Sequence, residues 1–132
     1  MRQITAHQLD PTIRDYNAMP IIALDDKGIA GAHHTYVIAT SAYPQADGMI
    51  NFTNELAFIE FQNGNIQESG INGIHNEHLL AIVQDRLECF QQGEFKSDFN
   101  AGALEHVKLA MAALHARTTE RINRGVKRRN EQ

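Results

Sequence analysis

Several features that would mark particular classes of protein are absent from this 132-residue chain. Cys89 is the only cysteine, which excludes an intrachain disulfide and is typical of proteins in a reducing compartment. No run of about 18 uninterrupted apolar residues occurs that would span a membrane. The N-terminal stretch MRQITAHQLDPTIRDYN lacks the apolar core of a signal peptide. We therefore expect a soluble, intracellular protein with no membrane partner.

The motifs of two large enzyme classes are also missing. The sequence contains neither the phosphate-binding loop that ends in Gly-Lys-Ser/Thr nor the Gly-x-Ser-x-Gly elbow of serine hydrolases. His33, His34 and Thr35 have the His-x-Thr form of two-histidine phosphoesterases, but that chemistry needs two such motifs and one is present. A structural or surface role is the simpler interpretation of this histidine pair. An enzyme that acts through it remains an alternative.

Metal and thiol chemistry have little support in the sequence. His75 and His78 lie three residues apart near Glu77, but no further ligand follows at a motif spacing, and zinc needs four filled positions. Cys89 follows Glu88 and has no neighbouring cation in the sequence that would activate its thiol. We therefore expect no catalytic residues, no metal site and no cofactor.

The composition is that of a globular protein, with 42% apolar and 21% charged residues. The net charge of −4 conceals a basic end, because residues 117–132 carry +4 and the rest of the chain −8. A basic end favours an anionic partner, although cations also suit a helix C-terminus, and both interpretations stay open from Lys127 onward. Arg117, Arg121 and Arg124 share one helical face, which favours an anion site.

The first half of the chain has the composition of a β-sheet. The apolar run 21–24 leads into a turn signal, and residues 32–40 and 56–62 are rich in the β-branched and aromatic residues typical of strands. Residues 41–54 contain proline, glycine and small polar residues and predict a loop. Asn63-Gly64 then predicts a type I′ hairpin, with "NIQESGI" returning as the partner strand.

The second half has helical periodicity. Asn76 predicts a helix cap, and apolar residues then recur every three or four positions until Gly93, which would end the helix. Ser97 or Asp98 predicts the cap of a second, longer helix. Because a short turn joins the two helices, they must lie antiparallel as an αα-hairpin. The apolar positions are Leu79, Leu80, Val83, Leu87, Phe90, Leu104, Val107, Met111 and Leu114.

Together these elements predict an α+β fold, a small N-terminal antiparallel β-sheet followed by a C-terminal antiparallel α-helical hairpin. We expect a single domain over residues 1–132. Within it we assign residues 1–28 to an N-terminal extension, 29–74 to the β part, 75–126 to the helical hairpin and 127–132 to a basic tail.

Residues 59–126 contain the motifs Phe-Gln-Asn-Gly, GINGIHNEHLLAIVQDRL, FQQG, FNAGAL and RTTERINRGV. These motifs resemble Thoeris anti-defence one, a family of phage proteins that inhibits Thoeris immunity and whose helical hairpin is shared with phage sponges for cyclic oligonucleotides. The chain departs from the family pattern at Asn65, where proline is usual, and at 97–99, where Cys-Arg-Glu is usual. A basic tail after Gly125 also replaces the family's usual ending.

The resemblance implies a protein that sequesters glycocyclic ADP-ribose, a cyclic ADP-ribose-type signal made by a TIR-domain enzyme, without cleaving it. It implies action in the host cell cytoplasm, assembly into a homo-oligomer (a dimer or a hexamer), and cyclic di- or trinucleotides as further ligands. By motif, Phe90 would stack on adenine, Asn100 would hydrogen-bond the ligand, and Arg117 would meet the base or a phosphate, with Arg121 in the same site. The residue types suit these roles, although Phe90 also fits the apolar stripe of a core.

The spacing of these residues adds a constraint. Asn100 and Arg117 lie roughly 25 Å apart along one helix at its normal rise, which is too far for one compact dinucleotide. Both would touch one ligand only if they come from different chains, with Leu80, Val107 and Met111 as candidates for the subunit interface. The main alternative is a basic-tailed nucleic-acid or protein-interaction module, which needs only the C-terminal charge.

Overall fold

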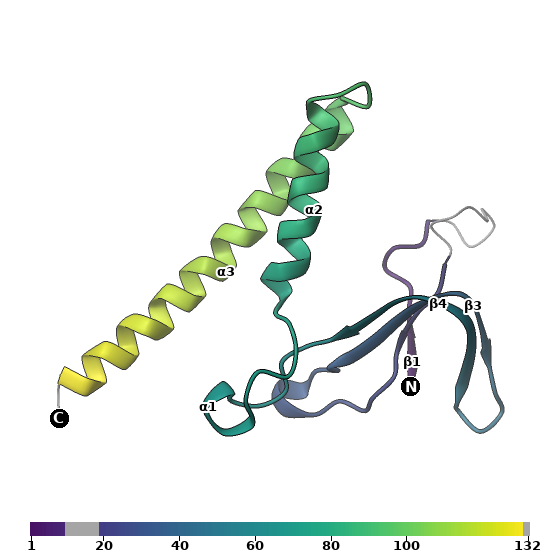
Figure 1. Ribbon diagram of the computed structural model, residues 1–132, viewed down its shortest axis with the longest axis horizontal. Helices are drawn as coiled ribbons and strands as arrows, with labels where there is room; N and C mark the ends of the chain where they lie inside the picture. The colour runs from purple at the N-terminus through teal and green to yellow at the C-terminus, as the bar shows by residue number, and fades with distance from the viewer. Residues whose placement is uncertain (10–18, 131–132) are drawn as a thin grey trace. The chain divides into compact units, whose positions relative to one another are not determined.

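The structure is a computed structural model that describes residues 1–9 and 19–130, without the side chains of 126–130. The expected cations of the basic tail, Lys127, Arg128 and Arg129, therefore lie outside the described side chains. The chain divides into two compact units, Met1–Ile74 and His75–Gln132. The first contains an antiparallel sheet and the second two long helices, so the predicted α+β class is confirmed (Figure 1).

The first unit contains a four-stranded sheet in which every neighbouring pair is antiparallel. Its strands follow chain order as β1 (Arg2–Ile4), β2 (Ile21–Ala23), β3 (Thr35–Pro44) and β4 (Ile50–Glu60). A short 3-10 turn, Ile29–Gly31, lies between β2 and β3. The segment assigned to an N-terminal extension thus supplies β1 and β2. β2 pairs with β3, and β1 pairs with β2 on its other side.

The core of this unit is small. Ile22, Val37 and Ile50 are buried, one from each of β2, β3 and β4. Ile22 and Val37 are register partners, which places them on the same face of the sheet. Four partly buried hydrophobic residues pack around this cluster: Met1, Leu24, Ala42 and Phe52. The core therefore draws on residues between Met1 and Phe52, including buried residues of three strands.

The prediction of a loop over residues 41–54 is wrong, because β3 and β4 include most of these residues. The two strands form a long hairpin whose turn contains Asp47 and Gly48, where Asp47 Oδ1 accepts a hydrogen bond from the Met49 N–H at 2.9 Å. Gly48 has a φ of 85°, a conformation that glycine adopts without strain. Asp-Gly is thus the turn signal of the hairpin, and Pro44 is tolerated because it ends its strand.

The prediction of a type I′ hairpin at Asn63-Gly64 is also wrong. A type I′ turn needs positive φ at both central residues. Gly64 has a φ of 89°, whereas Asn63 is not among the non-glycine residues with positive φ. The expected return strand instead contains a short helix, α1 (Ile66–Ser69), whose N-cap residue Asn65 accepts a hydrogen bond from the Gln67 N–H at 2.8 Å.

Two amide side chains close this loop onto itself. The Asn63 N–H donates to Asn72 Oδ1 at 2.8 Å, and Asn72 Nδ2 donates back to the Asn63 carbonyl at 2.8 Å. Gln62 Nε2 donates to the Gly70 carbonyl at 2.8 Å, and Gln62 Oε1 accepts from the Asn72 N–H at 3.0 Å. We call Gln62, Asn63 and Asn72 the amide clasp. A Cβ at the adjacent Gly73 would overlap the backbone of Phe61 and Gln62, so the clasp requires glycine there.

The start of β3 is held by a carboxylate. Asp25 accepts hydrogen bonds from the backbone N–H groups of His34 (2.9 Å) and Thr35 (3.0 Å). His33 Nδ1 lies 2.7 Å from the Asp25 carbonyl oxygen, and its ring meets Tyr36 edge-on. Burial alone would raise the pKa of Asp25, but the backbone N–H donors and the nearby His33 together lower it.

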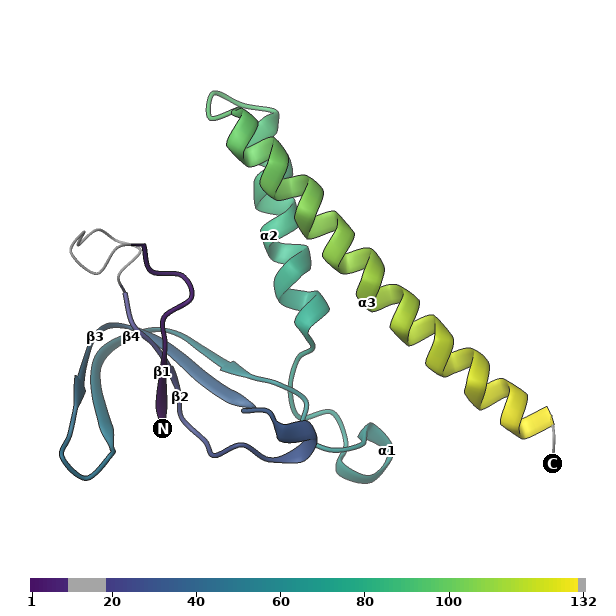
Figure 2. The ribbon, with the colours of Figure 1, turned by 180° about the vertical axis from the view of Figure 1, so that it is seen from behind.

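The second unit is the predicted antiparallel hairpin, formed by α2 (Asn76–Gln91) and α3 (Asp98–Asn130) (Figure 2). The cap of α2 is His75 rather than Asn76, and the His75 N–H donates to His78 Nδ1 at 2.9 Å. Ser97 caps α3, because its Oγ accepts from the Asn100 N–H at 3.0 Å. The first helix ends at Gln91, two residues before Gly93.

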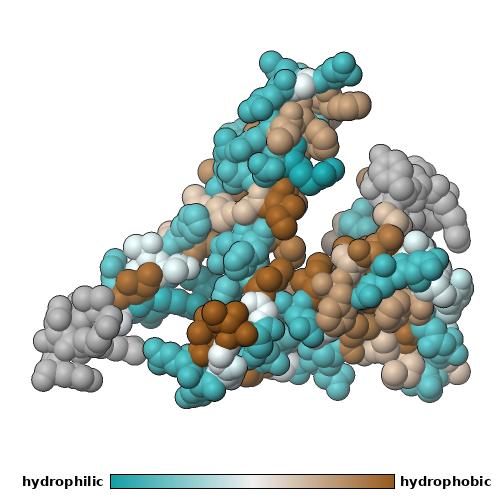
Figure 3. Space-filling model, viewed as in Figure 1, coloured by the Kyte–Doolittle hydropathy of each residue, from teal (hydrophilic) through white to brown (hydrophobic). Residues whose placement is uncertain are grey.

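No described residue of the two helices is fully buried. The apolar residues that helical periodicity predicted to pack together are half-buried except for Val83. The half-buried residues include Leu80, Val107 and Met111, which we expected at the subunit interface. Val83 is 44% exposed, and three large apolar side chains outside these positions are more exposed still: Ile82 58%, Leu109 59% and Ile122 59%. Tan atoms lie among teal ones near the turn end of the hairpin, at the top of Figure 3. A single chain therefore leaves much of the hairpin's apolar surface uncovered.

We predict that Asp25→Asn lowers the free energy of unfolding at pH 7 by about 1–3 kcal/mol, because a neutral amide oxygen replaces a carboxylate that accepts several N–H groups. The folded pKa of Asp25 lies below its unfolded value. Its contribution is therefore complete above the unfolded pKa and is lost as the pH falls through the folded pKa. Urea denaturation at pH 7 and in acid should show the difference between wild type and variant shrinking at low pH.

The exposed neighbour Asp26 provides the matched control for this experiment. Asp26→Asn should leave the stability nearly unchanged. Equal effects of the two substitutions would contradict the role given to Asp25.

Candidate ligand-binding site

Phe90 lies in the last turn of α2, where two side chains contact its ring. The Arg86 guanidinium carbon lies 5.4 Å from the ring centroid, in a cation–π arrangement one helical turn away. Phe95, in the turn between the helices, meets the ring at 6.4 Å and 72°. Phe90 itself is half-buried. It therefore has both the packing of a core residue and a side that remains exposed to solvent.

Asn100 lies in the first turn of α3 and is tied to the same turn. Its Nδ2 donates to the Phe95 carbonyl at 3.1 Å, and its backbone N–H donates to Ser97 Oγ. The Ser97 N–H in turn donates to Gln91 Oε1 at 3.1 Å. Phe90 and Asn100 are thus brought together through Phe95 at the turn end of the hairpin. We call Arg86, Phe90, Phe95 and Asn100 the turn-end cluster.

Arg117 and Arg121 lie elsewhere on the hairpin. Both are exposed, and the described side chains form no ion pair with either. At the normal helical rise α2 is roughly 24 Å long and α3 roughly 50 Å, so α3 continues well beyond α2, as Figure 2 shows. The continuous helix from Asp98 to Asn130 keeps Asn100 and Arg117 roughly 25 Å apart. One chain therefore does not bring the four predicted site residues into a single pocket.

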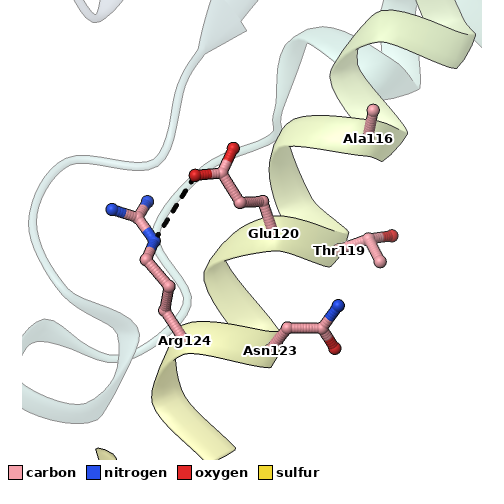
Figure 4. A pocket seen from close by; sticks show the side chains of 5 residues that line it. All are labelled: Ala116, Thr119, Glu120, Asn123 and Arg124. Atoms are coloured by element: carbon pink, nitrogen blue, oxygen red, sulfur yellow. Dashed lines mark ion pairs between the residues drawn. The ribbon is translucent and has the colours of Figure 1, made fainter. Parts of the chain in front are cut away.

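A hollow on α3 lies next to the predicted arginines without including Arg117 or Arg121. It is open to solvent and lined by Ala116, Thr119, Glu120, Asn123 and Arg124. Figure 4 shows Glu120 and Arg124 side by side, joined by an ion pair of 3.7 Å. Because a carboxylate neutralises the cation in this hollow, it is a weaker anion site than the neighbouring face with Arg117 and Arg121.

Histidine, cysteine and carboxylate side chains are the possible metal ligands among the described residues. No cluster of three or more His, Cys, Asp or Glu side chains there could hold a metal ion. The histidines considered for catalysis surround Asp25, with ring nitrogens of His33 and His34 at 3.9 and 3.8 Å from its carboxylate. The described helices include none that is both long and apolar enough to cross a membrane.

Sequence reasoning missed two members of the turn-end cluster. Arg86 precedes Phe90 by four residues, a spacing at which side chains on one helix meet, and this signal could have identified it. Phe95 lies in the turn, where no periodicity applies. Its role depends on the path of the backbone between the two helices.

The fold and this site define a small α+β protein whose C-terminal helical hairpin presents an aromatic ring, an amide and cations. Residues 53–119 match the hairpin domain of the Acb2/Tad1 family. A similar protein, Thoeris anti-defense 1 of Bacillus phage SBSphiJ7, is 35% identical over 120 residues, covering 80% of this chain and 84% of that protein. The chain belongs to the Acb2/Tad1 family, and the family assignment made from the motifs is confirmed.

We predict that Asn100→Ala lowers the free energy of unfolding by about 1 kcal/mol even without a ligand, because the Phe95 carbonyl loses its side-chain donor. Urea denaturation of the full chain measures the change. Asn76→Ala, an exposed asparagine at the start of α2, is the matched control and should have a smaller effect. No loss of stability in Asn100→Ala would mean that the side chain is free to serve a ligand alone.

Proposed function

We propose that this protein is a phage anti-defence protein that blocks Thoeris signalling by sequestering a cyclic ADP-ribose-type molecule. The ligand we propose is glycocyclic ADP-ribose, held without cleavage, with cyclic di- or trinucleotides as further ligands. The observation that carries the proposal is the match to Thoeris anti-defense 1 over four-fifths of the chain. A signal made inside an infected cell would be captured there, so we place the protein in the host cytoplasm.

The chemistry of the predicted site residues supports binding of a nucleotide. Phe90 would stack on the adenine base, Asn100 would hydrogen-bond the ligand, and Arg117 and Arg121 would bind its phosphates. Aromatic rings hold any base through stacking, and an arginine side chain can pair with a phosphate through two parallel hydrogen bonds. Arg117 and Arg121 are available for this because the described carboxylates leave them unpaired.

The separation of these residues supports a site shared between chains. Phe90 and Asn100 lie at the turn end, whereas Arg117 is roughly 25 Å along α3. A second copy of the hairpin, lying antiparallel, would bring its Arg117 next to the first copy's Phe90. The exposed Ile82, Val83, Leu109 and Ile122 offer apolar surface for such an assembly, a dimer or a hexamer. Ligand binding at a shared site would then stabilise the oligomer by mass action.

Sequestration can be distinguished from catalysis by recovering the ligand. We predict that glycocyclic ADP-ribose incubated with the protein is retained after removal of unbound ligand and is released unaltered when the complex is heated. Liquid chromatography with mass spectrometry identifies the released molecule, and ligand heated without protein is the control. An altered product would support an enzyme that acts through His33 and His34. Failure to retain the ligand would favour the nucleic-acid or protein-interaction module.

The arginine face provides a test that does not disturb the fold. We predict that Arg117→Ala weakens ligand binding by about 1.5–3 kcal/mol, the worth of a charge-assisted hydrogen bond. The melting temperature should stay the same, because the side chain is exposed. Calorimetry and thermal denaturation of the same sample measure both quantities. Lys27→Ala, which removes an exposed cation from the sheet unit, controls for net charge, and equal losses in the two variants would remove Arg117 from the site.

A further inference from the structure

Within one chain, a cation that lies over the Phe90 ring, Arg86, is not one of the arginines that the family motifs point to. Arg86 holds its guanidinium carbon 5.4 Å from the centre of the Phe90 ring. Arg117 belongs to a part of α3 roughly 25 Å from Asn100, which shares the turn with Phe90. A base stacked on Phe90 would therefore have Arg86 as its neighbour before any second chain is considered.

Arg86 is accessible to a ligand that reaches Phe90. The side chain is exposed, it makes no ion pair with the described carboxylates, and its contact with Phe90 is a cation–π interaction of the weak, solvent-exposed kind. A planar guanidinium that lies on an aromatic ring keeps its N–H donors at the edge of its plane. Those donors are free for an anion that arrives together with a base.

We infer that Arg86 is the cation of the turn-end cluster that binds a phosphate of the ligand whose base lies on Phe90. This inference rests on the proposed function, because it takes a nucleotide as the ligand. Each chain then contributes an aromatic ring, an amide and a cation at the turn end of its own hairpin. Arg117 and Arg121 of another chain would complete the same site from the other side.

The alternative role for Arg86 predicts the opposite change in ligand affinity when the side chain is removed. If the guanidinium merely covers the ring, a base must displace it, and removing it would strengthen binding. If the guanidinium binds phosphate, removing it weakens binding. The direction of the change in affinity therefore separates the two roles.

The experiment compares Arg86→Gln and Arg86→Lys with wild type, using glycocyclic ADP-ribose and isothermal titration calorimetry. Gln keeps a planar polar group but loses the charge, and we expect its dissociation constant to rise about tenfold, which corresponds to about 1.4 kcal/mol. Lys keeps the charge and should recover most of the affinity. The difference between wild type and Arg86→Gln should shrink as the salt concentration is raised, because salt screens exposed charges.

Lys108→Gln is the matched control, since it removes an exposed cation from the same hairpin. It should bind like wild type, and thermal denaturation of every variant verifies that the hairpin is folded. Unchanged or tighter binding by Arg86→Gln, or equal binding by Arg86→Gln and Arg86→Lys, would overturn the role of Arg86 while leaving the proposed function intact. Absence of binding by wild type would instead overturn the proposed function, and this inference with it.

Discussion

The helical hairpin cannot bury its own apolar side chains, and this constraint governs the second half of the molecule. Two helices in contact cover one stripe of each other, so even Leu80, Val107 and Met111 reach only half-burial. Ile82 and Leu109 remain more than half exposed. Surface of this kind on a small protein is costly in water unless another surface covers it. The assembly that we propose follows from this deficit, and so does a ligand site made from two chains.

The sheet unit has a small apolar core, and side-chain hydrogen bonds to its backbone hold the loops outside that core. In the amide clasp, the side chains of Gln62 and Asn72 hydrogen-bond the backbone of Asn63, Gly70 and Asn72 in the loop around α1. The Asp25 carboxylate does the same for the backbone N–H groups at the start of β3. These side chains hold the chain in place where few apolar contacts exist. The asparagine-rich corners are therefore structural in this unit, and the ligand chemistry that we propose lies in the hairpin.

The hairpin was predictable from the sequence, whereas much of the sheet was not. Helical periodicity is local, so the apolar spacing from Leu79 to Phe90 and the Ser97 cap were sufficient to place two antiparallel helices. A strand depends on its partners. Residues 41–44 and 50–54 form strands because each pairs with the other across the Asp47-Gly48 turn. Asn63-Gly64 forms no hairpin because Asn72, nine residues along the chain, bonds the backbone of Asn63.

The sequence by itself determined the α+β class, the family and the identity of Phe90, Asn100, Arg117 and Arg121 as site candidates, because motifs and helical spacing are properties of neighbouring residues. Only the tertiary structure decided which of these meet. The turn between the helices places Phe95 against both Phe90 and Asn100. The unbroken course of α3 keeps Arg117 distant from Asn100, whereas Arg86 lies over the Phe90 ring. Proximity depends on where the chain turns and where it continues straight, and residue identity alone does not specify either.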